Sequence, residues 1–357
     1  GPRVLIAGRE RDYFSGTGYL GLQSHPHVLQ AAVEAVRHYG LSTATSRGGY
    51  GEHPIYDLLE SELRAYFDTQ SALYFSTGYL GAVVLAQGLR ARCERVFIDE
   101  WSHFSVWDGA LAAGKPVVGY RHLDAAHLAE QLSTELRPGE RPLVLSDGVF
   151  PISGELAPLP GLLRAVAPYD GWVGLDDAHA VGAVGPSGRG TPDFYNVSPD
   201  RWVASGTLSK ALGGYGGILT GPSELLAELE KNTRVTVAAS PPPLPVAAAS
   251  AAALSIARAQ PQLRQQLWRN VSRARAGLRA LGWPLPETPV PILCLGARPG
   301  IDLAHLKDGL FERDICVAHV RNYSSTPPGG ALRIAIFANH TAEQIDRLVA
   351  ELGRLLE

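Results

Sequence analysis

Short apolar segments alternate with longer amphipathic segments through the first two-thirds of the 357-residue chain. Seven apolar segments have the length expected of buried strands: residues 71–75, 95–98, 116–120, 142–146, 172–175, 202–204 and 217–220. Residues 53–67 instead carry apolar side chains at the spacing of one helical face, namely Ile55, Leu58, Leu59, Leu63 and Phe67. This alternation predicts an α/β fold with a mostly parallel seven-stranded sheet that helices cover on both faces.

The pattern changes after residue 243, where residues 244–281 have the composition of one long helix. Farther on, strands are predicted at 291–295, 315–320 and 332–337, and helices at 302–311 and 341–355. We therefore predict four parts: an N-terminal segment (1–42), a large domain (43–243), a long connecting helix (244–281) and a small C-terminal α+β domain (282–357).

Composition narrows the classes of partner. The formal net charge of −3 argues against nucleic acid. No apolar run approaches the roughly 18–20 residues that span a bilayer, so we expect no membrane partner. The three cysteines, Cys93, Cys294 and Cys316, are far apart and odd in number. They favour buried thiols in a reducing cytoplasm over a metal site or a disulfide scaffold.

Two aspartates and a histidine follow the predicted strand at 172–175, in the sequence DDAH. Ligands of open α/β sheets bind beyond the carboxyl ends of the strands, which is where Asp176 and His179 would lie. A carboxylate at this place suits the ring nitrogen of pyridoxal 5′-phosphate (PLP), because a protonated ring can hold the electron pair of a carbanion. Either aspartate, and Asp177 especially, could instead cap a following helix.

Lys210 stands in the sequence GTLSKALGG, directly after another predicted strand. The hydroxyls of Thr207 and Ser209 and the amides of a glycine-rich turn suit a phosphate. A partly desolvated lysine can lose its proton, as formation of a Schiff base requires. The chain has only three other lysines, all in ordinary surface settings. Taken alone, this segment could also be a flexible surface loop.

Two further strand-to-helix junctions carry polar groups. In FSTGYLG, the amides of Gly78 and Tyr79 would open a helix whose N-terminus favours an anion, although ordinary βα turns look similar. In WSHFS, His103 lies between a strand and a helix, so that its ring could lie flat on a planar cofactor. A lone histidine at such a position could equally be a helix cap or a core residue.

Together these motifs resemble the α-oxoamine synthase family of fold-type I PLP enzymes, which includes 8-amino-7-oxononanoate synthase, 2-amino-3-ketobutyrate CoA ligase and 5-aminolevulinate synthase. The resemblance covers nearly the whole chain in order. Its segments are YLGL, GEHPIYDLL, FSTGY, WSHFS, DGVF, APL, DDAH, GTLSKALG and LRIAIFANH. The most specific part is DDAH followed by GTLSKALGG, with 34 residues from Asp176 to Lys210.

The resemblance implies a large PLP-binding domain and a homodimer with active sites at the subunit interface. Lys210 would form the Schiff base and act as acid and base at the substrate Cα, and Asp176 would pair with the pyridine nitrogen. His179 would contact the ring oxygen, and His103 would stack on the ring. The remaining assignments are the phosphate ligands Gly78, Tyr79 and Thr207, and the substrate-carboxylate arginine Arg333. A surface arginine on a strand is the alternative for Arg333.

Departures from the family pattern concern the substrate side. Thr17-Gly18 replaces the usual Asn-Asp, STATSR at residues 42–47 replaces GSGGSR, and Ala238-Ala239 replaces a Ser-Thr pair that reaches the neighbouring subunit's phosphate. Pro151 replaces a serine that helps hold the cofactor, a role that Ser153 could take over.

The implied reaction is decarboxylative condensation of an α-amino acid with an acyl thioester of CoA or of an acyl-carrier protein, which gives an α-amino ketone. An aminotransferase or a C–C lyase on the same scaffold is the alternative. A non-catalytic partner subunit is disfavoured because such subunits lose the lysine.

Overall fold

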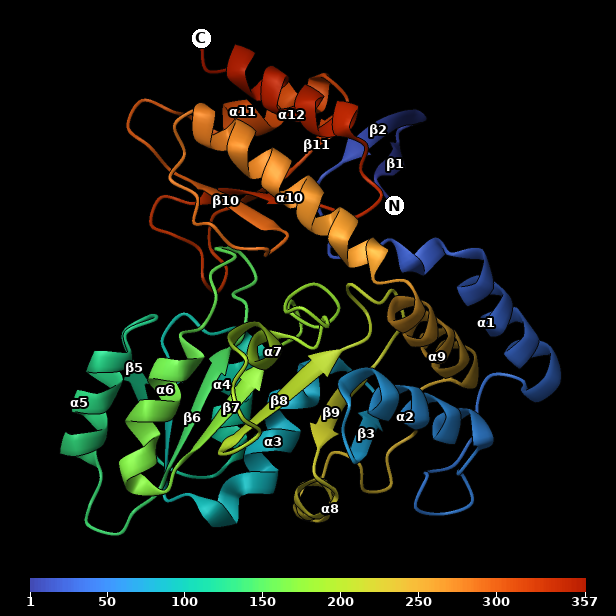
Figure 1. The fold of residues 1–357 in the computed structure, drawn as a ribbon, viewed down its shortest axis with the longest axis vertical. Helices are drawn as coiled ribbons and strands as arrows, with labels where there is room; N and C mark the ends of the chain where they lie inside the picture. Colours follow the sequence, from blue (N-terminus) through green and yellow to red (C-terminus); the bar gives the residue numbers. More distant parts are fainter.

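The computed structural model describes residues 1–357 and contains one seven-stranded sheet and two three-stranded sheets (Figure 1). The large sheet has the order β3-β9-β8-β7-β6-β4-β5, in which only β9 runs antiparallel to its neighbours. Its strands are β3 (Ser71–Phe75), β4 (Arg95–Asp99), β5 (Val117–Tyr120), β6 (Pro142–Asp147), β7 (Trp172–Asp176), β8 (Trp202–Thr207) and β9 (Gly217–Gly221). All seven lie at the predicted places, and the predicted fold class is confirmed.

Alternate side chains of the strands enter two separate hydrophobic cores. Leu143 and Leu145 of β6 pack in one core, and Val144 of the same strand packs in the other. The first core includes α3 (Gly81–Leu89), α4 (Phe104–Ala112) and α8 (Ser223–Asn232), and the second includes α5 (Ala125–Glu135) and α6 (Leu159–Val166). Both faces are therefore buried, which explains why the strands are continuously apolar.

Helix α2 (Pro54–Phe67) occupies the predicted segment and packs against β3 and α9 (Leu244–Ala259). Ile55, Leu59 and Leu63 are buried as expected, but Leu58 is 52% exposed. The core face of α2 is thus narrower than its apolar sequence pattern predicted. Helix α1 (Pro26–Tyr39) packs against the opposite side of α9 in the right-hand part of Figure 1.

The single long helix predicted at 244–281 is wrong. Two helices occupy this stretch, α9 and α10 (Gln262–Ala280), and they are separated at Gln260 and Pro261. A proline has no amide hydrogen and disfavours helical backbone in the residue before it, so the helix ends and a new one begins. The domain boundaries at residues 43, 244 and 282 stay a prediction.

The upper body in Figure 1 contains α10, α11 (Leu303–Glu312), α12 (Ala342–Arg354) and a sheet of the order β10-β13-β12. The predicted strand at 315–320 is divided around Val317 into β11 (Ile315–Cys316) and β12 (Ala318–Val320), while β10 (Ile292–Gly296) and β13 (Ala331–Ala335) follow the prediction. Two N-terminal strands that were not predicted, β1 (Arg3–Ile6) and β2 (Arg9–Tyr13), join β11 in the third sheet.

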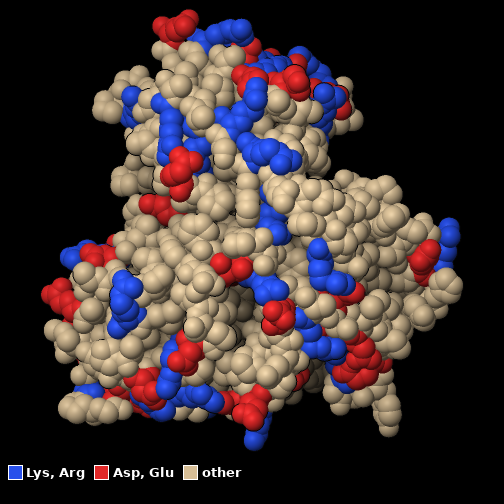
Figure 2. Space-filling view, in the orientation of Figure 1, with Lys and Arg blue, Asp and Glu red and all other residues tan.

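Charged side chains of both signs are interspersed over this upper body (Figure 2). One of the ion pairs crosses between helices, because Arg273 Nε of α10 donates to Asp346 Oδ1 of α12 at 2.6 Å. None of the helices combines the length and the hydropathy that crossing a membrane requires.

Candidate active site

A cavity of about 380 Å³ lies where β6, β7 and β8 end, and it is bounded on its other side by residues of the upper body. All eight predicted site residues line it: Gly78, Tyr79, His103, Asp176, His179, Thr207, Lys210 and Arg333. They come from five separate stretches of the chain. Two of the eight, Asp176 and Thr207, are the last residues of β7 and β8, and Asp147, the last residue of β6, lines the cavity as well. This is expected for a site at the carboxyl edge of a parallel sheet.

The two adjacent aspartates point to opposite sides of the sheet, because neighbouring residues of a strand do so. Asp176 lines the cavity, where its Oδ1 accepts from the amide of Ala178 at 3.1 Å and its Oδ2 accepts from Ser105 Oγ at 3.3 Å. Asp177 accepts from Thr191, through the amide at 2.7 Å and through Oγ1 at 2.6 Å. No helix begins at either aspartate, so the helix-cap interpretation is wrong.

Lys210 is the lysine that lines the cavity, and it follows β8 directly. Burial lowers the pKa of its amine, although the nearby carboxylates of Asp176 and Asp147 act in the opposite direction. A lowered pKa increases the share of the neutral, nucleophilic amine. The segment does form a turn, which agrees with part of the surface-loop interpretation. It is not a free surface loop, however, because it continues from β8 and lines the cavity wall.

His103 caps α4 and has a partner at each ring nitrogen. Its Nε2 lies 2.7 Å from Tyr323 Oη, and its Nδ1 lies 2.6 Å from Ser105 Oγ. Its backbone amide donates to Asp147 Oδ2 at 2.7 Å. Burial lowers the pKa of His103, and burial together with Asp176 raises the pKa of Asp147 well above its usual range. His103 is therefore a helix cap, as one alternative predicted, and it also lines the cavity; its stacking on a cofactor ring stays a prediction.

Arg333 is 7% exposed, so the surface-arginine interpretation is wrong. Its Nε donates to the Pro151 carbonyl at 2.7 Å, its Nη1 to the Gly16 carbonyl at 3.2 Å and its Nη2 to Tyr19 Oη at 3.3 Å. Tyr19 Oη also lies 2.7 Å from His179 Nδ1. The guanidinium is thus fixed in place by two separate segments, residues 16–19 and Pro151.

The phosphate end of the predicted site is tightly packed. The amide of Tyr79 donates to Thr77 Oγ1 at 3.4 Å at the start of the 3₁₀ turn Gly78–Leu80, which leads into α3. A Cβ at position 78 would lie 2.6 Å from Thr207 Cβ, so that only glycine fits there. Thr207 Oγ1 lies 2.8 Å from Ser209 Oγ, and both residues line the cavity. Backbone amides and hydroxyls of this kind suit a phosphate.

Sequence reasoning missed four polar residues around the cavity: Tyr19, Ser105, Asp147 and Tyr323. Ser105 and Asp147 stand inside the quoted segments WSHFS and DGVF, so a signal for them was present. Tyr323 belongs to a loop that had no recognisable motif. Pro151 lines the cavity, whereas Ser153 does not; Ser153 Oγ accepts from the amide of Glu155 at 3.4 Å.

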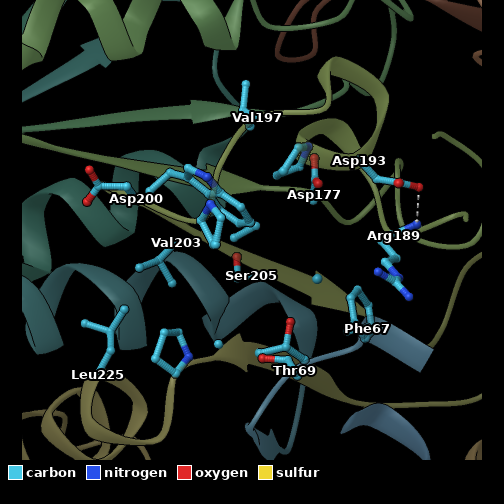
Figure 3. A pocket seen from close by; sticks show the side chains of 18 of the residues that line it. Phe67, Thr69, Asp177, Arg189, Asp193, Val197, Asp200, Val203, Ser205 and Leu225 are labelled. Carbon is cyan, nitrogen blue, oxygen red and sulfur yellow. Dashed lines mark hydrogen bonds between the residues drawn. The ribbon is translucent and has the colours of Figure 1, made fainter. Parts of the chain in front are cut away.

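A larger cavity, of about 850 Å³, lies on the other side of β8 between the end of α2 and the five-residue helix α7 (Thr191–Tyr195) (Figure 3). Charged groups in this cavity pair with one another; for example, Arg189 Nη1 donates to Asp68 Oδ2 at 3.4 Å. It is lined by Asp177 but not by the lysine, the two histidines or the arginine of the predicted site. The smaller cavity is therefore the candidate active site.

Comparisons with known proteins agree with this arrangement. The family model of aminotransferase class I and II matches residues 15–352. The 8-amino-7-oxononanoate synthase of Thioalkalivibrio sulfidiphilus is 36% identical over 99% of this chain and 90% of that protein. The enzyme of the same name from Methylococcus capsulatus is 37% identical over 98% of this chain and 90% of that protein. A similar solved structure is serine palmitoyltransferase from S. paucimobilis with a bound PLP–myriocin aldimine. The match has a TM-score of 0.92 and 26% sequence identity, and it spans 99% of this chain and 89% of that chain.

Proposed function

Because the chain belongs to the aminotransferase class I and II family, and within it to the α-oxoamine synthases, we propose that it is a PLP-dependent acyltransferase. It joins an α-amino acid to an acyl thioester, with loss of carbon dioxide and of the thiol, and gives an α-amino ketone. The observation that carries this proposal is the convergence of Lys210, Asp176, His179 and Arg333 on one cavity.

The residues that line the cavity fit PLP. The close approach of Gly78 to Thr207 supports a phosphate site made of the Gly78 and Tyr79 amides and the Thr207 hydroxyl. Asp176 supplies the carboxylate for the pyridine nitrogen, and His179 supplies a ring nitrogen for the ring oxygen. When bound, PLP supplies an aldehyde that bonds to amines and a protonated ring that holds the electron pair released at Cα.

Lys210 moves the proton in this scheme. Its lowered pKa supports a neutral amine, which would hold the aldehyde of the cofactor and would accept the proton from the substrate Cα. His103 lines the same cavity and is restrained at both ring nitrogens, which supports its role as a fixed surface against the cofactor ring.

Arg333 binds the substrate carboxylate. Its three contacts use one N–H from each guanidinium nitrogen and leave one N–H on each terminal nitrogen. One remaining N–H on each terminal nitrogen supports a bidentate contact with the two oxygens of a carboxylate.

We further propose a homodimer in the cytoplasm. Three large aromatic side chains that belong to segments lining the cavity, or lie within a few residues of them, are exposed in the single chain: Tyr79 (45%), Phe104 (51%) and Tyr215 (47%). Their exposure supports a subunit interface that covers them. The three cysteines are free, which supports a reducing compartment. Sedimentation equilibrium that gives a mass of one chain would refute the dimer.

The reaction is tested with carboxyl-¹³C-labelled amino acids, one at a time, on PLP-loaded protein. We expect ¹³CO₂, free thiol and an amino ketone in equal amounts when an acyl-CoA or acyl-carrier-protein thioester is present, and no stoichiometric keto acid when it is absent. Formation of keto acid and pyridoxamine phosphate without the thioester would make the protein an aminotransferase. Lys210→Ala is the inactive control.

A further inference from the structure

Tyr19 joins two residues of the candidate active site without lining the cavity itself. Its side chain has no exposed surface, and its hydroxyl lies 2.7 Å from His179 Nδ1 and 3.3 Å from Arg333 Nη2. The three residues are far apart in sequence and belong to the N-terminal segment, the turn after β7 and strand β13. A single buried hydroxyl therefore connects the cofactor side of the cavity to the substrate-carboxylate side.

The direction of these hydrogen bonds follows from the chemistry of the groups. An arginine guanidinium only donates, so the Tyr19 oxygen accepts from Arg333. A buried hydroxyl hydrogen must also find an acceptor, and His179 Nδ1 is the acceptor within reach. Burial raises the pKa of Tyr19 to about 12, so the hydroxyl keeps its hydrogen at neutral pH.

His179 then has only one possible arrangement. Burial lowers its pKa well below the usual range, so that the imidazole is neutral and carries a single hydrogen. Because Nδ1 accepts from Tyr19, that hydrogen is on Nε2. His179 lines the cavity, and no protein group forms a hydrogen bond with Nε2, which leaves this N–H free for a bound molecule.

We propose that Tyr19 is a positioning residue that fixes His179 in the tautomer with its hydrogen on Nε2 and links this donor to Arg333. The tautomer follows from the protein alone. The identity of the bound acceptor, the ring oxygen of PLP, rests on the proposed function. Without the Tyr19 hydroxyl, His179 can carry its hydrogen on either nitrogen, and only one of the two tautomers presents a donor to the cavity.

The test is Tyr19→Phe, which keeps the ring and removes only the hydroxyl. Tyr66→Phe is the matched control, because Tyr66 is also buried in the same hydrophobic core and its hydroxyl donates to the Gly188 carbonyl at 3.2 Å, away from the candidate site. Tyr19→Phe removes two buried hydrogen bonds and Tyr66→Phe removes one, so we expect a larger loss of stability from Tyr19→Phe, and only Tyr19→Phe should alter His179.

The readout is the pair of ¹⁵N chemical shifts of His179 in histidine-labelled, cofactor-free protein, identified by their absence in His179→Gln. In the wild type we expect a protonated Nε2 and an unprotonated Nδ1. In Tyr19→Phe we expect the two shifts to move toward each other, as a mixture of tautomers requires, while Tyr66→Phe keeps the wild-type pattern. A wild-type hydrogen on Nδ1 would overturn the proposal even if Tyr19→Phe did not fold, and so would an unchanged pattern in a folded Tyr19→Phe.

Binding of PLP is measured separately on the same samples by visible absorbance. We expect a PLP dissociation constant about twofold higher in Tyr19→Phe than in Tyr66→Phe, because an even mixture of tautomers leaves only about half of the molecules with a donor for the cofactor. If no variant and no wild-type sample binds PLP, the proposed function fails while the tautomer assignment stands on the ¹⁵N shifts. Equal dissociation constants in the two variants would overturn the link to the cofactor.

Discussion

His122 should make the stability of this protein depend on pH above neutrality. Its Nδ1 lies 2.9 Å from Asp99 Oδ1 and its Nε2 lies 3.1 Å from Glu155 Oε2, so that each ring nitrogen faces a carboxylate. The ring is stacked on Trp101 at 4.3 Å between centroids and meets the edge of Phe150 at 4.4 Å. Two carboxylates on one imidazole favour its charged form.

Burial opposes the protonation of His122, but the hydrogen bonds to Asp99 and Glu155 outweigh it and raise the pKa from 6.5 to about 9. Because the folded-state pKa lies above the unfolded value, the stabilisation is complete below about pH 6.5 and is lost as the pH rises through about 9. A shift of this size corresponds to about 3 kcal/mol. The side chain of Glu155 is 39% exposed and solvent weakens its part, so we expect a loss of about 1–3 kcal/mol.

The assay is urea unfolding of the wild type and of His122→Gln at a series of pH values from 6 to about 9.5, at fixed protein and cofactor concentrations. Glutamine keeps the polarity and removes the charge, so the variant should be less stable at pH 6 and should lack this pH-dependent loss. The exposed His38 of α1 provides the control substitution, His38→Gln, which should follow the wild type. A wild-type free energy of unfolding that stays constant over this range, or an equal fall in His122→Gln, would refute the reasoning.

Three further outcomes follow from the cavity and its surroundings. Lys210→Ala should lose the visible absorbance that PLP gives when bound to a lysine, whereas Lys231→Ala on the surface helix α8 should keep it, as spectra of the purified proteins will show. Arg333→Lys should raise KM for the amino acid at least about tenfold, since lysine cannot form the bidentate contact, with a smaller change in PLP affinity; steady-state kinetics and PLP titration separate the two. Gly148→Ala should lower the thermal unfolding midpoint by several degrees, because its Cβ would lie 1.7 Å from Asp177 Oδ1; an unchanged midpoint would contradict the described packing.

The sequence predicted the elements that place the cofactor residues, because these elements have strong local signals. Strands β3 to β9 are short, apolar and bounded by turns. The candidate residues Asp176 and Thr207 are the last residues of their strands, and His179 and Lys210 lie a few positions farther along the chain. Hydrophobic periodicity is insensitive to an interruption of one or two residues, however. The end of α9 before Gln260 was therefore missed, although Pro261 in the sequence indicated it. Strand β2 was missed because four of its five residues are charged, and β1 was missed because it has only four residues and Leu5 is 71% exposed.

The contacts that orient the site could not be predicted because they join side chains hundreds of residues apart. Tyr19 and Arg333 are separated by 314 positions, and His103 and Tyr323 by 220. No periodicity or spacing relates such positions, since they meet only when the upper body packs onto the large sheet. The motifs therefore identified which residues line the cavity, but not which groups hold them in orientation.

Agreement with the family pattern and departure from it occur on different walls of the same cavity. Lys210, Asp176 and His179, which match, follow the ends of sheet strands, where the backbone is fixed by hydrogen bonds to neighbouring strands. Thr17 and Pro151, which depart from the family pattern, belong to a wall of the cavity that is made by loops, where substitutions disturb no sheet. Changes on that wall can alter the shape that a substrate meets while the cofactor wall stays intact. Because Arg333 also matches the family pattern, we expect the carboxylate of the amino acid to be bound by a motif residue, and the loops of Thr17 and Pro151 to contribute to the choice of side chain and acyl donor.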